Sequence, residues 1–143
     1  IARFVTLQNE YSLLERELEA DVQPLCERLG VGILPFFPLA SGLLSGKYRR
    51  GSEPPNDARL QGDRAGTDAQ FDVIEALTDF AQARGVELLD VAIAGLAAQP
   101  AIASVIAGAT KPEQVEANVA ALRWEPTAED LAELDRIAPT PRA

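Results

Sequence analysis

The sequence predicts an α/β fold in which about three parallel strands are covered by helices. Three short apolar runs, at residues 4–7, 31–36 and 101–106, are typical of buried strands. Segments with helical periodicity separate them, and connections of this length favour right-handed crossovers between parallel strands. The predicted order is strand, helix, strand, long loop, two helices, strand and two helices, with no internal repeat and no dividing linker.

The first helix is expected between Asp21 and Gly30. The later part of residues 15–29 carries one apolar stripe, made by Val22, Leu25, Cys26 and Leu29. Pro24 deep inside a helix would cost about 3 kcal/mol. The helix should therefore begin near Asp21, a good N-cap residue, and end at Gly30.

Residues 37–68 form a long irregular segment that contains several glycines and the Pro54-Pro55 pair. Loops of this length in compact domains are usually functional or disordered. We expect residues 37–48 to be ordered on a ligand and residues 49–68 to be a mobile loop without one.

Four helices are predicted in the second half of the chain, at residues 69–84, 88–99 and 112–122 and after Thr127. The second is apolar on almost every side, so it should be covered all round. The other three each have one apolar face that we expect to point inward: Phe71, Ile74, Leu77 and Ala81, then Val115, Val119 and Leu122, then Leu131, Leu134 and Ile137. Thr127 and Asp130 have the spacing of a capping box.

Residues 102–118 lead from the last predicted strand into a helix and are the most informative stretch of the chain. Thr110 and Glu113 have capping-box spacing, and Pro112 would lie in the first turn, where its missing N–H costs nothing.

This turn also has the features of an anion site. A strand that passes through Gly108 to a helix N-terminus leaves N–H groups and the positive end of the helix dipole for a ligand, and Lys111 adds a formal charge. An ordinary strand-to-helix turn would have the same features, so this pattern alone leaves both interpretations open.

Three segments resemble the aldo-keto reductase family. GATKPEQ at residues 108–114, followed by Asn118, resembles the family's last strand-to-helix turn, which holds the 2′-phosphate and adenine of NADP(H). Residues 35–48 resemble the long loop after the seventh strand, which wraps the pyrophosphate, and residues 7–14 resemble the sixth strand. The match covers about residues 4–137, so it implies the C-terminal portion of a (β/α)8 TIM barrel.

The resemblance implies that residues 1–143 are the cofactor-binding part of an NADP(H)-dependent oxidoreductase that reduces aldehydes and ketones by hydride transfer. The family's proton-donating tyrosine and its lysine, aspartate and histidine neighbours come from earlier strands, and none falls within this chain. Tyr11 and Tyr48 match other family positions, so we assign no catalytic residue here and expect this chain alone to be inactive. The alternatives are a non-catalytic NADP-binding regulatory or interaction module, as in potassium-channel β subunits, and an associating half-barrel without a ligand.

The resemblance also implies a set of cofactor-binding residues: Gln8, Phe36, Pro38, Leu39, Ser41, Gly42, Leu44, Lys47, Gly108, Thr110, Lys111, Gln114 and Asn118. In this scheme Gln8 hydrogen-bonds the nicotinamide carboxamide and Phe36 stacks on the ring. Gln8 merely capping a strand end and Phe36 as a plain core aromatic are the structural alternatives. Residues 38–47 approach the pyrophosphate through their backbone, with Lys47 adding charge.

At the other end of the cofactor, Thr110 and Lys111 would meet the 2′-phosphate, Gln114 would flank it and Asn118 would recognise the adenine edge. The family usually has glutamate just before that asparagine, whereas this chain has Ala117, which weakens the expected adenine contact. A cation at Lys111 favours NADP over NAD. Arg59 is a further candidate phosphate ligand, with Arg50 and Arg64 as rivals and a solvated surface as the simpler interpretation.

Composition narrows the possible partners. A net charge of −9 argues against nucleic-acid binding, and no apolar run is long enough to span a membrane. The single cysteine, Cys26, excludes a disulfide framework and is expected in the core. No targeting segment is visible, so the cytoplasm is the expected location.

The chain contains no methionine and opens beside a predicted strand, and we expect it to be a piece of a longer polypeptide. Three strands cannot close a barrel. The expected partners are the missing N-terminal part of the same barrel and a small carbonyl substrate, with self-association through open sheet edges as a further possibility.

Overall fold

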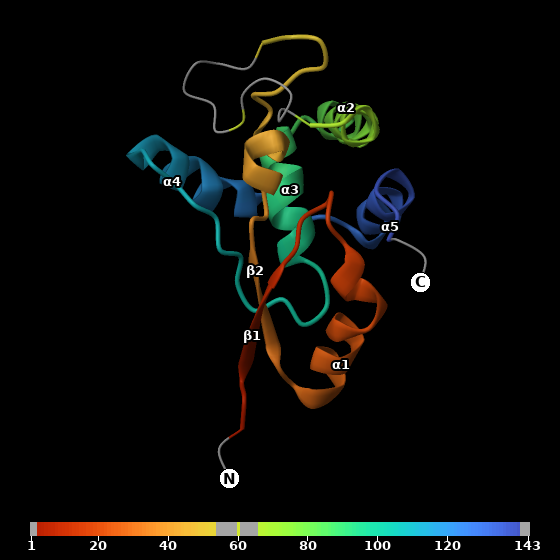
Figure 1. The fold of residues 1–143 in the computed structure, drawn as a ribbon, viewed down its shortest axis with the longest axis vertical. Coiled ribbons are helices and arrows are strands. Elements are labelled where there is room, and N and C mark those ends of the chain that lie inside the picture. Colours follow the sequence, from red (N-terminus) through yellow and green to blue (C-terminus); the bar gives the residue numbers. More distant parts are fainter. Residues whose placement is uncertain (1–2, 54–59, 61–65, 141–143) are drawn as a thin grey trace.

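The computed structural model describes residues 3–53, 60 and 66–140 (Figure 1). Its elements, in which η marks a 3-10 helix, are β1 (Thr6–Glu10), η1 (Glu17–Ala20), α1 (Val22–Leu29), β2 (Gly32–Phe36), η2 (Ala40–Ser45), α2 (Asp68–Ala83), α3 (Leu88–Ala97), α4 (Pro112–Ala120), η4 (Ala121–Arg123) and α5 (Ala128–Ile137). Much of the predicted mobile loop, together with Arg59 and Arg64, lies outside the described residues, so its mobility stays a prediction.

The two strands pair in parallel, from Thr6 opposite Gly32 to Glu10 opposite Phe36. This parallel pairing across a helical connection confirms the α/β class. Within the described chain, the outer edge of β1 pairs with no other strand.

The prediction of a regular third strand at residues 101–106 is wrong. This segment runs along β2 but makes only two isolated parallel bridges, Ile33 with Ile102 and Phe36 with Ile106. Its Ala103 N–H donates to the Ile33 carbonyl, and its Ile106 N–H donates to the Pro35 carbonyl. Between the two bridges, residues 103–105 of the segment lie beside residues 34 and 35 of β2. The segment thus has one extra residue, which interrupts the ladder.

The first strand lies later than predicted. Residues 4–7 were expected to form it, with Gln8 at its end, but β1 spans Thr6–Glu10 and Gln8 lies at its centre. Phe4 and Val5 precede the strand and are exposed. The position of the strand is set by its pairing with β2, which apolar character alone does not reveal.

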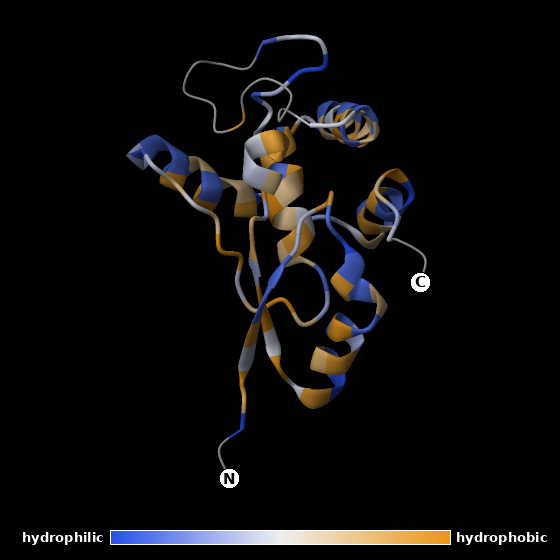
Figure 2. Cartoon of the chain, viewed as in Figure 1, coloured by the Kyte–Doolittle hydropathy of each residue, from blue (hydrophilic) through white to orange (hydrophobic). Residues whose placement is uncertain are grey.

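Helix α3 forms the centre of the core. It is buried on almost every side, as predicted, and contacts η2, α2, α4 and η4. Figure 2 shows that its ribbon is hydrophobic over nearly its whole length, whereas hydrophilic and hydrophobic stretches alternate along α4. The small residue Gly95 lets α5 approach α3, because a β-carbon there would lie 3.2 Å from Leu134 Cδ1.

Helices α2 and α5 cover one side of this core. The predicted inward residues of α2, namely Phe71, Ile74, Leu77 and Ala81, are all buried. In α5 Leu134 is fully buried, and the predicted capping box of Thr127 and Asp130 is present. Arg84 joins the two helices, since it lies 3.5 Å from the centre of the Phe80 ring and pairs with Asp130 at 2.5 Å.

Two predicted apolar faces are only partly buried. Helix α1 begins after Asp21 and ends at left-handed Gly30, as predicted, and Cys26 is in the core. However, Leu25 and Leu29 of its stripe are exposed. The predicted inward face of α4 does point toward α3, since Val115, Val119 and Leu122 line a groove between the two helices, but all three are more than half exposed.

Candidate functional site

The paired strands place Gln8 and Phe36 on one face of the sheet. Gln8 is opposite Leu34 and Glu10 is opposite Phe36, and alternate residues of a strand point to the same side. Gln8 therefore does not cap a strand end. Phe36 is the last residue of β2 and is half-buried, at the carboxyl end where parallel α/β folds bind their ligands.

The chain is strained directly after β2. Phe37 has a φ of 55° and is 44% exposed, and its ring meets the edge of Phe36 at 5.3 Å between centroids. Ala40 and Ser41 also have positive φ angles, of 46° and 58°, and Gly42 follows at 104°. Left-handed backbone is unfavourable for residues with a β-carbon, and such strain is concentrated at functional sites.

The turn formed by Ser41 and Gly42, which we call the η2 turn, is held by its neighbours. The Leu39 carbonyl accepts hydrogen bonds from the N–H groups of Gly42 at 2.8 Å and Leu44 at 3.2 Å. Ser45 Oγ donates to the Gly42 carbonyl at 2.6 Å. Three hydrogen bonds within residues 39–45 thus hold the shape of the turn.

The candidate cofactor-binding residues of this segment differ in how deeply they are buried. Pro38 and Leu44 are buried, and the Leu44 side chain has no exposed area, so these two support the segment from below. Leu39, Ser41 and Gly42 are half-buried. Lys47 is exposed at the end of the segment.

The predicted capping box at Thr110 and Glu113 is wrong. Helix α4 begins at Pro112, so Lys111 is its N-cap residue and Gln114 its third residue. The Gln114 side chain reaches back, and its Oε1 accepts hydrogen bonds from Thr110 N at 2.7 Å and Thr110 Oγ1 at 3.2 Å. A lysine side chain has no acceptor, so it cannot cap the first N–H groups of the helix.

Two donors of Thr110 thus converge on one oxygen beside an uncapped helix N-terminus. In this structure Gln114 provides that oxygen, and an anion would compete with Gln114 for the same donors. Gly108, Thr110 and Lys111 are exposed, and a β-carbon added at Gly108 would meet no atom within 4 Å. Figure 1 shows η2 and the first turn of α4 toward the same end of the molecule, where β2 finishes.

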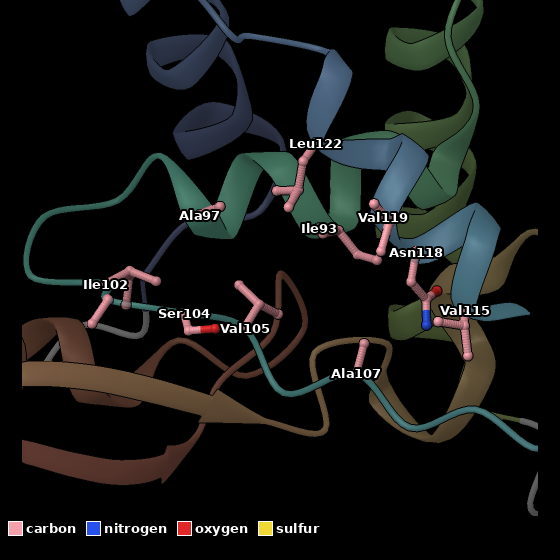
Figure 3. A pocket seen from close by; sticks show the side chains of 11 residues that line it. Ile93, Ala97, Ile102, Ser104, Val105, Ala107, Val115, Asn118, Val119 and Leu122 are labelled. Carbon is pink, nitrogen blue, oxygen red and sulfur yellow. The ribbon is translucent and has the colours of Figure 1, made fainter.

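Asn118 lies in a different environment from the η2 turn. It lines a groove of about 370 Å³ between α3, α4 and residues 102–107, together with Val115, Val119 and Ile93. Figure 3 shows these side chains facing residues 102–107 across the groove. None of residues 36–47 lines this groove. The described residues thus bring Thr110 and Gln114 together, but they leave Asn118 in a separate, apolar groove.

The hydroxyls of the two tyrosines make different hydrogen bonds, and only that of Tyr11 donates its proton within the chain. Burial and a hydrogen bond to Glu19 raise the pKa of the Tyr11 hydroxyl far above its ordinary value, and this hydroxyl donates to Glu19 Oε1 at 2.5 Å. The Tyr48 hydroxyl accepts a hydrogen bond from Leu60 N at 2.8 Å. Within the described part of the chain, no group of His, Cys, Asp and Glu side chains could hold a metal ion.

Sequence reasoning missed two features near the site. One is the buried network of Arg16, Glu19 and Tyr11 beside the carboxyl end of β1, for which the Arg-x-x-Glu spacing is the only local signal. The other is the hydrogen bond between Tyr48 and Leu60, two residues twelve positions apart, which no local sequence pattern indicates.

A profile of the Aldo/keto reductase family matches residues 1–139, and the chain belongs to this family. Protein tas of Escherichia coli K12 is 32% identical over 140 residues, which cover 96% of this chain and 40% of that protein. L-glyceraldehyde 3-phosphate reductase of Escherichia coli O157:H7 is 34% identical, over 90% of this chain and 40% of the relative.

A probable voltage-gated potassium channel subunit beta of Oryza sativa subsp. japonica is 37% identical, over 80% of this chain and 37% of the relative. The chain therefore spans about two fifths of the length of these relatives. None of the helices in the described ranges has the length and apolar character needed to cross a membrane.

Proposed function

We propose that this chain is the NADP(H)-binding part of an aldo-keto reductase that reduces aldehydes or ketones to alcohols. The observation that carries the proposal is the pair of Thr110 donors that converge beside the uncapped, positive end of α4. Family membership supports it, because the chain has the segments that resemble the family's cofactor loops.

The chain's own residues fit a phosphorylated dinucleotide at two places. The η2 turn presents small residues in a backbone shape that L-residues adopt only when held, and Lys47 is exposed beside it. The first turn of α4 provides helix N–H groups, the Thr110 donors and the exposed cation Lys111. We propose that the former binds the pyrophosphate and the latter the 2′-phosphate.

When bound, the cofactor would supply the hydride for carbonyl reduction. The role of Gln8 in the proposal is to orient the nicotinamide through its side-chain amide. Phe36 would provide an aromatic face at the carboxyl end of β2. Lys111 would favour NADP over NAD, since only the former places a phosphate dianion beside this cation.

The proposed partner is the N-terminal part of the same barrel, which would contribute the proton donor and bind a small carbonyl substrate. This proposal is supported by the unpaired edge of β1 and by the exposed apolar residues Phe4, Val119 and Leu122. Self-association of the chain through the same edges is the alternative. Sedimentation of the purified chain distinguishes a monomer from a self-associated form.

The test of the proposed function is titration of the purified chain with NADPH and NADH, followed by nucleotide fluorescence. NADPH is expected to bind more tightly than NADH, and Lys111→Gln should weaken NADPH binding by about five- to fifty-fold while changing NADH binding little. Arg123→Gln, which removes an exposed cation in η4, is the matched control. A chain that binds neither nucleotide would refute the proposal.

A non-catalytic NADP-binding module is the second candidate function. It is favoured by the similarity to a probable voltage-gated potassium channel subunit beta, a protein that is named as a channel subunit and not as a reductase. Adding an aldehyde to the NADPH-loaded full-length protein and following cofactor absorbance separates the two functions. Loss of absorbance supports the reductase, and unchanged absorbance with retained binding supports the module.

A further inference from the structure

The side chain of Tyr48 connects the η2 turn to a later part of the chain. Tyr48 is only 5% exposed and lies three residues beyond the end of η2. Its ring packs beneath Gly42, because a β-carbon built on Gly42 would lie 3.4 Å from Tyr48 Cε2. The ring therefore contacts the turn at Gly42, next to Ser41, whose φ is unfavourable for a residue with a β-carbon.

The hydroxyl of Tyr48 makes the second contact. It accepts the backbone N–H of Leu60 at 2.8 Å, twelve positions further along the chain. Leu60 itself is half-buried and packs against the hydrophobic core. One side chain thus has its ring on the η2 turn and its hydroxyl on the backbone N–H of a residue whose side chain packs against the core.

The η2 turn requires such support. Ser41 has a φ of 58°, which is unfavourable for a residue with a β-carbon, and Gly42 has a φ of 104°. A strained conformation persists only when its surroundings over-determine it. The hydrogen bond from Ser45 Oγ to the Gly42 carbonyl holds one side of the turn, and the Tyr48 ring supports it from beneath.

We propose that Tyr48 is a positioning residue that holds the η2 turn in the shape that binds the pyrophosphate. This inference rests on the proposed function, because it requires the turn to be part of the dinucleotide site. Tyr48 would act through the turn and through Leu60, without touching the cofactor. Its effect should therefore be restricted to ligands that carry the pyrophosphate.

Two ligands separate a positioning role from a general structural one. NADPH spans both proposed subsites, whereas 2′-AMP carries only the adenine and 2′-phosphate assigned to the first turn of α4. Tyr48→Phe removes the hydroxyl and keeps the ring. Loss of one hydrogen bond in the support should weaken NADPH binding about two- to ten-fold and leave 2′-AMP binding unchanged.

The Leu60 end of the contact provides an independent pair of variants. Leu60→Pro removes the N–H that Tyr48 accepts, and Leu60→Ala keeps that N–H while removing the side chain. Leu60→Pro should reproduce the selective loss of NADPH binding, and Leu60→Ala should show less of it. This pair decides the question if Tyr48→Phe fails to fold.

Calorimetric titration of the wild-type chain and these variants with both ligands is the experiment. Equal losses for the two ligands, or no loss for either, would overturn the role of Tyr48 while the proposed function stands. If the wild-type chain binds neither ligand, the proposed function fails and the inference fails with it.

Discussion

The Arg16 guanidinium donates a hydrogen bond of 2.6 Å to the backbone carbonyl of Ala138, which lies 122 residues later in the chain. Arg16 is 3% exposed and also pairs with Glu19 and Asp135, both at 2.6 Å. Thr140 donates to the second oxygen of Glu19 at 2.8 Å. One buried cation therefore holds the segment after β1 against the segment that follows α5.

Removing the guanidinium of Arg16 should lower the free energy of unfolding. Arg16→Met leaves Glu19 without its bidentate partner and the Ala138 carbonyl without its donor, so we expect a loss of about 3–5 kcal/mol in the free energy of unfolding. Urea denaturation measures it. Arg28→Met, which removes an exposed arginine from the last turn of α1, should cost less than about 0.5 kcal/mol. Equal stability of the two variants would contradict the role of Arg16.

The same network predicts a pH dependence. Burial alone would raise the pKa of the Glu19 carboxyl, but hydrogen bonds from Arg16, Tyr11 and Thr140 hold this pKa below its ordinary value of 4.5. A carboxyl whose pKa is lower in the folded chain stabilises the fold above pH 4.5, and this contribution is lost as the pH falls through the folded pKa.

Wild-type stability should therefore fall below about pH 4.5, and Glu19→Gln should be less stable at neutral pH with a shallower acid slope. Chemical denaturation at a series of pH values gives both quantities. Glu17→Gln, at an exposed glutamate of the same short helix, is the control and should keep the wild-type slope. An unchanged slope in Glu19→Gln would show that other groups cause the acid loss.

Gly32 of β2 lies close to Ala103, and a pair of substitutions that compensate for each other in size tests this contact. A β-carbon on Gly32 would lie 2.8 Å from the Ala103 β-carbon, closer than two carbon atoms can approach. Gly32→Ala should destabilise the chain by about 1–3 kcal/mol. The double variant with Ala103→Gly should recover much of this loss, and a double-mutant cycle measures the coupling. Additive effects of the two substitutions would mean that the contact is absent.

Replacing Ala101 with glycine should remove the free-energy cost of its left-handed backbone conformation. Its φ of 61° is unfavourable for alanine, yet its carbonyl must accept the Ile33 N–H at 2.7 Å to hold the segment against β2. Ala101→Gly should therefore stabilise the chain by about 0.5–1 kcal/mol, measured by urea denaturation. Ala103→Gly, two positions away in the same segment, should destabilise it. Destabilisation by both would argue against the left-handed conformation of Ala101.

Features that depend on neighbouring residues were predicted well. The limits of α1 at Asp21 and Gly30, and the capping box of Thr127 and Asp130, each depend on residues within one helix. The all-round burial of α3 follows from its apolar composition. The resemblance to the aldo-keto reductases identified the family that the profile match shows.

Features that require a choice between alternative partners were not predictable in the same way. Gln8 was expected at the end of a strand, but the pairing of β1 with β2 puts it opposite Leu34 at the centre. Thr110 was expected to cap α4, but the helix begins one residue later and Gln114 reaches back to it. In each case two alternatives have similar local free energies, so packing elsewhere decides between them.

From its residues alone this chain is an α/β protein with a defined series of helices and loops, because hydropathy and capping act over a few positions. Only the tertiary structure decided which residue of β2 Gln8 lies opposite, which backbone group donates to the Tyr48 hydroxyl and which carbonyl accepts from Arg16. The reason is physical: a hydrogen bond requires atoms within about 3 Å in a suitable direction, and that placement depends on how the whole chain packs.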